Sequence, residues 1–331
     1  ARDEMKSRLN KWRRAGFHFE LDWLLRVINV VLTGQSLFSA MRNTTTEEFK
    51  LGLDKAEKYI DRLLNLIAGR LGLDHDRVLG SRYSFPLMCR YLEQRGGDFA
   101  NQAERDKLLF WYIHTFLWGR YSGSTESTLA KDLELIRSVD TDQYQDGLDD
   151  LIAGLRLQRG NLTLKESDFA GATKGSRFYP LLYMMTRVCH ARDFASGDEL
   201  SNHILGHLAQ LQIHHIFPKA MLRQYEFTRR EINAIANFTF LTQETNLEIS
   251  KQDPAIYFPY YEKKNRGVLR SHWIPSDKDL WDVRYYRDFL SERRALLAED
   301  ANRFLDKLFT GGMAATPDSI PIVDRVVANV P

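Results

Sequence analysis

The stretch IHHIFP, residues 213–218, places two adjacent histidines inside a short apolar run that a proline ends. Asn237 follows 22 residues after His215 and introduces FTFLT, residues 238–242. This second stretch is aromatic, β-branched and alternating, a pattern typical of a strand. The sequence therefore predicts two short strands, one carrying the histidines and the other beginning after an asparagine.

A third stretch, NLEISK at 246–251, opens on Asn246, nine residues after Asn237. We expect it to form a short helix that ends before the next proline, because the residue before a proline disfavours the helical conformation. Two strands and a helix can bring His214, His215 and Asn246 together.

These side chains suit the hydrolysis of a phosphodiester. Because successive residues on a strand point to opposite faces, one imidazole can hold a metal while the other faces an attacking water. A neutral imidazole serves both purposes near neutral pH, and the amide oxygen of Asn246 suits Mg²⁺ or Mn²⁺. The reaction needs an activated water and a cation that stabilises developing charge. The pattern predicts a metal-dependent nuclease.

The order His-His, Asn, Asn around a strand resembles the HNH (ββα-metal) nucleases. HHIFPKAML, IANFTFLTQETNLEISK and FLSERRALLAEDANRFL are similar to the C-terminal nuclease domain of GmrSD-type modification-dependent restriction proteins. GRYS at 119–122 and residues 20–33 resemble the helical region that precedes this domain. The resemblance covers about 15–310 and is most specific in 212–251.

The resemblance implies a role for each residue that matches the motif. His215 matches the general base, and His214 matches the metal ligand that precedes it. Asn246 matches the second ligand of a divalent cation, Mg²⁺ or Mn²⁺. Asn237 matches the middle asparagine, which braces the loop between the strands and helps to orient the base.

Basic residues follow these motifs. Lys251 lies just beyond Asn246, and EKKNRGVLR at 262–270 carries four basic residues against one acid. That stretch is either a solvated loop or an edge that follows the phosphates beside the active site. We assign the DNA-binding role to Lys251, Lys263, Lys264 and Arg266.

The resemblance also implies a substrate, a biological role and an additional domain. The substrate is DNA, from phage or otherwise foreign and perhaps modified, and the role is antiviral restriction in the cytoplasm. One such site nicks one strand, so a double-strand break needs two nicks or a homodimer. In the family a ParB-like N-terminal domain with DGQQR-type and FxRxNxxG-type motifs comes first. Neither motif is in this sequence, so we expect the chain to be the C-terminal part of a longer protein.

The rest of the sequence predicts a mainly α fold. We expect a helical domain at 1–157, an HNH-type nuclease domain at 158–310 with its ββα unit embedded in helices, and an irregular tail at 311–331. Thr44–Thr46 followed by two glutamates predicts a capping box at the start of a long helix. Further helices are expected at 18–33, 84–95, 103–118, 126–137, 143–157 and 177–192.

Bulk composition narrows the class of protein. The 331 residues carry a net charge of only +2, which excludes a histone-like basic coat. The two cysteines form no CxxC, as expected of buried thiols in a reducing cytoplasm. No apolar stretch approaches the roughly 18 residues of a membrane helix, so no membrane partner is expected.

Several alternatives stay open. The two histidines of the pair could be structural, and a zinc site is disfavoured because no cysteine lies nearby. His203 and His207 lie one helical turn apart and could form a separate metal pair. The principal rival is a catalytically inactive DNA-binding or regulatory module of the same family. A second rival is an HNH-like nuclease that cuts RNA.

Overall fold

The structure, a computed structural model, describes residues 2–137, 144–201 and 211–312. It divides into two compact units. The first combines Ala1–Arg70 and Asp74–Leu162 with the end of the last helix from Leu305 onward, and the second combines Leu71–Leu73 with Thr163–Phe304. The described residues are mainly helical with one two-stranded sheet, which confirms the predicted fold class.

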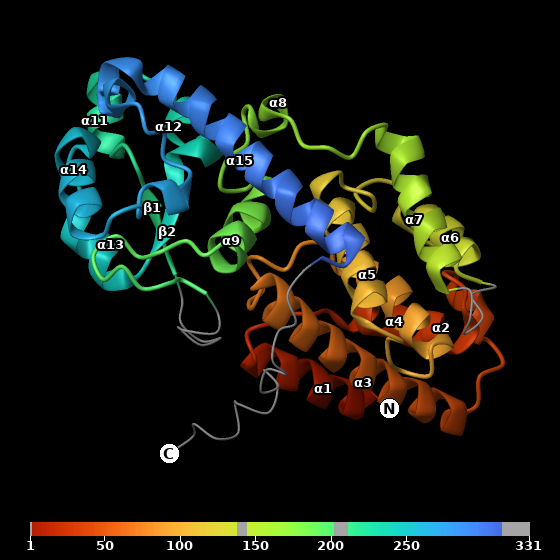
Figure 1. The fold of residues 1–331 in the computed structure, drawn as a ribbon. Helices are drawn as coiled ribbons and strands as arrows, with labels where there is room; N and C mark the ends of the chain where they lie inside the picture. Colours follow the sequence, from red (N-terminus) through yellow and green to blue (C-terminus); the bar gives the residue numbers. More distant parts are fainter. Residues whose placement is uncertain (1, 138–143, 202–210, 313–331) are drawn as a thin grey trace. The chain divides into compact units, whose positions relative to one another are not determined.

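The first unit is built from helices (Figure 1). They are α1 (Arg2–Arg14), α2 (Leu21–Thr33), α3 (Thr46–Leu71), α4 (Phe85–Gln94), α5 (Gln102–Leu117), α6 (Thr125–Leu135) and α7 (Tyr144–Arg159), with short 3₁₀ turns η1 (Phe38–Met41) and η2 (Arg82–Ser84). α5 is buried nearly all round from Leu108 to Leu117 and is therefore a core helix. The predicted helices are found, with ends that differ by a few residues.

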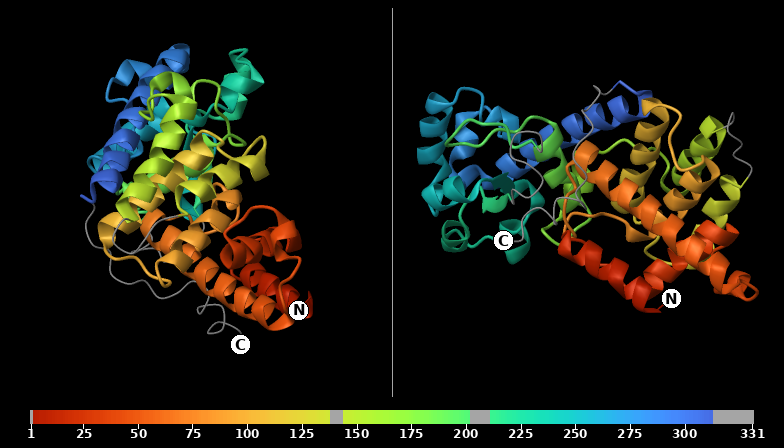
Figure 2. Two further views of the ribbon diagram at one scale, coloured as in Figure 1. Left: turned by 90° about the vertical axis from the view of Figure 1, so that its right-hand side faces the viewer. Right: turned by 90° about the horizontal axis from the view of Figure 1, so that it is seen from below.

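The long helix α3 begins at the predicted capping box. The Thr45 hydroxyl accepts from the Glu48 backbone N–H at 3.2 Å, and the Glu48 carboxylate accepts from the Thr45 N–H at 2.8 Å. Such a cap stabilises a helix by about 1 kcal/mol. α1 lies alongside α3 (Figure 2), where the Lys11 amine contacts Glu57 at 2.7 Å and Asp61 at 2.8 Å.

The second unit surrounds a β-hairpin with short helices. Its elements are α8 (Glu166–Phe169), α9 (Phe178–Val188), β1 (Gln212–His215), α11 (Lys219–Gln224), α12 (Arg229–Ile232), η3 (Ile235–Asn237), β2 (Phe238–Leu241), α13 (Gln243–Ile249), α14 (Pro254–Lys264), η4 (Arg270–His272), η5 (Lys278–Trp281), η6 (Val283–Tyr285) and α15 (Tyr286–Thr310), whose end belongs to the first unit. Figure 1 shows the hairpin between α9 on one side and α13 and α14 on the other.

The two strands pair antiparallel, with His214 opposite Thr239 and His215 opposite Phe238. Opposite residues share a face of the sheet, so the adjacent histidines point to opposite faces. The ring of Phe240, on the face of His215, packs against α9, and its centroid lies 5.0 Å from that of Tyr183. The His214 ring faces α14 instead, 6.0 Å from Tyr257.

The helix after β2 begins earlier than expected. α13 starts at Gln243, so Asn246 lies within the helix rather than opening it. The reason is Thr242, whose hydroxyl accepts from the Thr245 backbone N–H at 3.4 Å and caps the helix. The helix ends at Ile249, and Ser250 follows with a φ of 51°.

The polar segment 163–176, which precedes α9, takes part in the second unit. Leu164 exchanges two backbone hydrogen bonds with the Asn302 amide, each of 2.8 Å. The Ala172 carbonyl accepts from the Ile235 N–H at 2.7 Å, and Thr173 forms an isolated bridge with Ala234. The segment is thereby fixed beside the residues that precede β2.

Two expectations fall wholly or mostly outside the described residues. They are the metal pair His203 and His207, and the tail 311–331, of which the structure describes only the first two residues. Among the described helices, none is both long and apolar enough to cross a membrane.

Candidate active site

His214 and Asn246 meet between β1 and α13. The His214 Nδ1 atom lies 2.8 Å from the Asn246 Oδ1 atom. An amide oxygen only accepts, so in this pairing the imidazole Nδ1 donates. The opposite ring nitrogen, Nε2, is buried and has no hydrogen-bond partner. Burial lowers the pKa of His214 to about 4, although the bond to Asn246 acts in the other direction. The imidazole is therefore neutral near pH 7, as a metal ligand must be.

This pair fits a hard divalent cation. In the octahedral shell of Mg²⁺, ligands at about 2.1 Å place neighbouring donor atoms about 3 Å apart. The Nδ1–Oδ1 separation of 2.8 Å is close to that value, and a cation would take the place of the shared proton. The described residues contain no cluster of three or more His, Cys, Asp or Glu that could hold a metal. A closed zinc site is thus disfavoured there, whereas Mg²⁺ commonly keeps waters and phosphate oxygens as its other ligands.

His215 lies on the opposite face of the hairpin in a basic setting. Burial and the charge of Lys219 lower its pKa to about 4, and a hydrogen bond to Asn233 partly opposes them. The Nε2 atom is buried without a partner. The Asn233 amide is itself held by donating to the Arg229 carbonyl at 2.8 Å. The result is a neutral imidazole with one ring nitrogen oriented and the other free to accept a proton. Asn233 was not singled out from sequence, where it is one polar residue in a helical turn.

Asn237 is fully buried and bonds only to backbone. Its side-chain oxygen accepts from the Phe217 N–H at 2.9 Å, and its amide donates to the carbonyls of Phe217 and Ile232, each at 3.1 Å. These bonds close the loop between the two strands. Asn237 thus connects Phe217, just after β1, with Ile232, before β2, and its role in the reaction stays a prediction.

A buried carboxylate anchors α13. Asp193 accepts from the Thr242 N–H at 3.0 Å and from its hydroxyl at 2.9 Å, and it also accepts the Thr245 hydroxyl. Burial alone would raise the pKa of Asp193, but the bonds from Thr245, Thr242 and Ser196 lower it. The ionised carboxylate therefore fixes the helix that carries Asn246. Because Asp193 lies 49 residues before Thr242, the sequence does not indicate this contact.

A buried arginine on α15 holds the backbone at the start of β2. Arg293 donates to the carbonyls of Ala236 and Phe238 at 2.7 Å each, and to the His272 carbonyl at 3.1 Å. Its partners are carbonyls and not a carboxylate, and burial lowers the pKa of Arg293 to about 9.

Two open cavities are lined by Asn233, which bonds to His215, and basic side chains line both of them. The first has a volume of about 510 Å³ and the second about 490 Å³. They share Arg229 and Asn233, the residue that orients His215. The lining basic residues are Lys219, Arg223 and Arg229 in the first, and Lys174, Arg229 and Arg230 in the second. No acidic residue lines either cavity.

The four residues predicted to bind DNA are placed elsewhere. Lys251, Lys263, Lys264 and Arg266 are exposed, and none of them is among the lining residues of these two cavities. Glu262, the acid of that stretch, accepts from the Gly267 N–H at 2.7 Å and so shapes the turn after α14. Their role in DNA binding stays a prediction.

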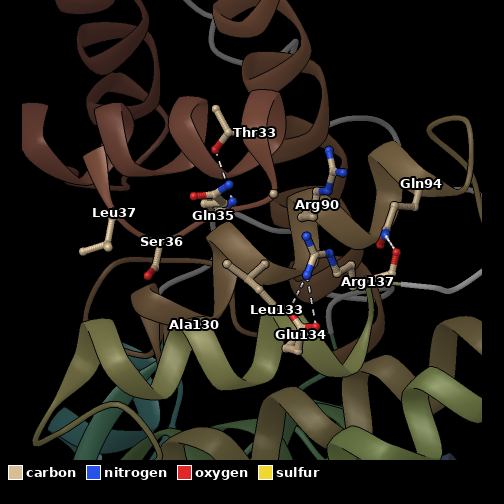
Figure 3. Close-up of a pocket in the computed structure, with 11 residues that line it drawn as sticks. Thr33, Gln35, Ser36, Leu37, Arg90, Gln94, Ala130, Leu133, Glu134 and Arg137 are labelled. Atoms are coloured by element: carbon tan, nitrogen blue, oxygen red, sulfur yellow. Dashed lines mark hydrogen bonds and ion pairs between the residues drawn. The ribbon is translucent and has the colours of Figure 1, made fainter. Parts of the chain in front are cut away.

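A further cavity, of about 320 Å³, lies in the first unit (Figure 3). Its polar side chains are engaged in local structure. Arg90 donates to the Val31 carbonyl at 2.8 Å at the end of α2, and Gln94 donates to the Ile136 carbonyl at 2.8 Å. Arg137 pairs with Glu134. These groups stabilise helix ends, so the cavity is not assigned a ligand.

Residues 160–300, which lie in the second unit apart from the first three, match the family model of the C-terminal domain of the GmrSD restriction endonucleases. This match confirms the resemblance found in the sequence for that part of the chain.

A curated relative extends beyond this domain. An uncharacterized protein of Methanocaldococcus jannaschii is 27% identical over 220 residues, which are 61% of this chain and 35% of that protein. The chain thus spans about a third of the length of this relative.

Proposed function

We propose that the second unit is a divalent-metal-dependent HNH-type endonuclease that hydrolyses one strand of DNA at a time. The observation that carries the proposal is the arrangement of two adjacent histidines. His214 meets an amide oxygen at 2.8 Å on one face of the hairpin, while His215 presents an unpartnered ring nitrogen on the other. The proposed ligand His214 and the proposed base His215 are thus adjacent on β1, and the second proposed ligand, Asn246, contacts His214 from α13.

Each residue of the proposed site has a separate role in the reaction. His215 accepts a proton from the attacking water through Nε2, and Asn233 holds its ring in the required orientation. His214 and Asn246 would hold the cation, which supplies stabilisation of charge on the phosphorane and the leaving oxygen. Asn237 keeps the loop between the strands closed, and Asp193 keeps α13 against β1. The 3′-side alkoxide leaves as the P–O bond breaks, and water supplies its proton.

The biological role follows from the domain class. A restriction endonuclease domain acts on foreign DNA, so we propose defence against phage, including phage with modified bases. A ParB-like domain upstream, and a homodimer for double-strand cutting, are further parts of this proposal. They rest on the resemblance of the chain to the GmrSD-type proteins.

Plasmid relaxation tests this function. The full chain should convert supercoiled plasmid to the open circular form in Mg²⁺ or Mn²⁺, with little linear product at early times, and EDTA should stop the conversion. Binding of DNA without relaxation in either metal would instead favour the inactive DNA-binding module. Cleavage of RNA in preference to DNA would favour the ribonuclease alternative.

A further inference from the structure

A cluster of exposed basic residues lies around the two cavities that Asn233 lines, and no acidic residue lines those cavities. Lys219 and Arg223 lie one turn apart on α11, and Arg229 and Arg230 begin α12. Lys174 comes from the turn next to the bridge between Thr173 and Ala234. We call these five residues the basic cleft. Figure 1 shows α11 and α12 together at one end of the hairpin.

The acid nearest in sequence to this cleft is already engaged. Glu231, on α12, accepts the Thr228 hydroxyl at 2.7 Å and pairs with Arg287 at 2.7 Å. Among the ion pairs that the described residues form, none involves a residue of the basic cleft. Five uncompensated positive charges around two open cavities favour a polyanion.

The cleft is also in the right place for the substrate of the proposed nuclease. Asn233 lines both cavities and bonds to the His215 ring, so the cleft adjoins the proposed base. A phosphate backbone seated on these residues would therefore bring a phosphodiester to the base. The segment 262–270 has no such link to His215 among the described contacts.

We propose that the basic cleft, and not the basic segment 262–270 at the end of α14 and in the turn after it, binds the phosphate backbone of the DNA strand that is cut. This inference rests on the proposed function and names the surface that serves it. The ligand is duplex DNA, recognised through its phosphates and independently of base sequence. The cleft provides no aromatic platform of the kind that stacks single-stranded bases: its lining residues include one aromatic, Phe227.

Charge-matched variants of the full chain test the proposal. The cleft variant carries Lys219→Gln, Arg223→Gln and Arg229→Gln. The segment variant carries Lys263→Gln, Lys264→Gln and Arg266→Gln, and a variant of α1 with Lys6→Gln, Arg13→Gln and Arg14→Gln serves as the control. Each loses three positive charges, so differences among them report position and not net charge.

The measurement is the affinity for a short fluorescein-labelled DNA duplex, by anisotropy in EDTA across a salt series. Each phosphate contact contributes about 0.9 to the slope of log K against log salt. The cleft variant should bind at least about tenfold more weakly, with a slope smaller by about 2 to 3. The other two variants should stay within about twofold of the original chain.

Equal affinity of the cleft variant and the original chain would overturn the proposal, as would a larger loss in the segment variant. No binding of the duplex, or tighter binding of an RNA of the same length, would also overturn it.

Circular dichroism checks the fold of each variant. If the triple variant unfolds, the double variant Lys174→Gln with Lys219→Gln should still bind the duplex severalfold more weakly. Because no metal is present, this result is independent of cleavage. Binding through the cleft without plasmid nicking would reject the proposed function alone.

Discussion

At the scale of single residues, the two adjacent histidines differ in their surroundings. His214 is buried against an amide oxygen, and His215 is half-buried among lysines and arginines. The sequence predicts that their side chains point to opposite faces of the sheet, because successive side chains of a strand alternate between the two faces. It could not predict Asn233, because the contact depends on how the loop before β2 folds back.

If His214 and Asn246 hold the cation, replacing either residue should weaken metal binding. His214→Ala and Asn246→Ala should each weaken Mn²⁺ binding by at least about tenfold in calorimetry, because each removes one of two protein donors. His190→Ala is the matched control, since that histidine is 76% exposed at its side chain and pairs with Glu199. Unchanged Mn²⁺ affinity in the His214 variant would rule this residue out as a ligand.

At the scale of elements, α13 shows where sequence patterns were sufficient and where they failed. The sequence predicts the helix, but the helix begins three residues before Asn246, because Thr242 caps it. The capping box of α3 was recognised, since both of its partners lie within four residues of each other. Asp193 could not be recognised, because nothing in the sequence links a carboxylate to a helix cap 49 residues away.

Removing the charge of Asp193 should loosen α13. We expect Asp193→Asn to lower the free energy of unfolding by about 2–3 kcal/mol at neutral pH, because several donors lose a charged acceptor. The folded-state pKa lies below the ordinary 3.8, so the stabilisation is present above that pH. It is lost as the pH falls through the folded-state value, and the difference between the two proteins should shrink there.

Urea denaturation across pH measures this difference. Asp198→Asn, at an exposed position of the same turn, is the control and should change the free energy of unfolding by less than about 0.5 kcal/mol. Equal stability of the Asp193 variant and the original chain at neutral pH would show that the carboxylate does not anchor the helix.

At the scale of the whole molecule, periodic patterns predicted the fold class well. Apolar stripes at helical spacing gave the helices of the first unit, and the alternation in FTFLT gave β2. The location of the basic cleft did not follow from the sequence. Its residues come from three short segments, none of which is a run of charges, whereas the segment 262–270 carries four basic residues within nine positions.

The central claim is that one residue, His215, activates water in a metal-dependent nicking reaction. The most direct measurement is relaxation of supercoiled plasmid by His215→Ala in Mn²⁺, beside the original chain and the His190→Ala control. A general base contributes about 100-fold or more to rate. We expect the variant to lose nicking by at least that factor while its unfolding temperature and Mn²⁺ affinity are retained. Nicking by a folded His215→Ala protein at the original rate would contradict the account.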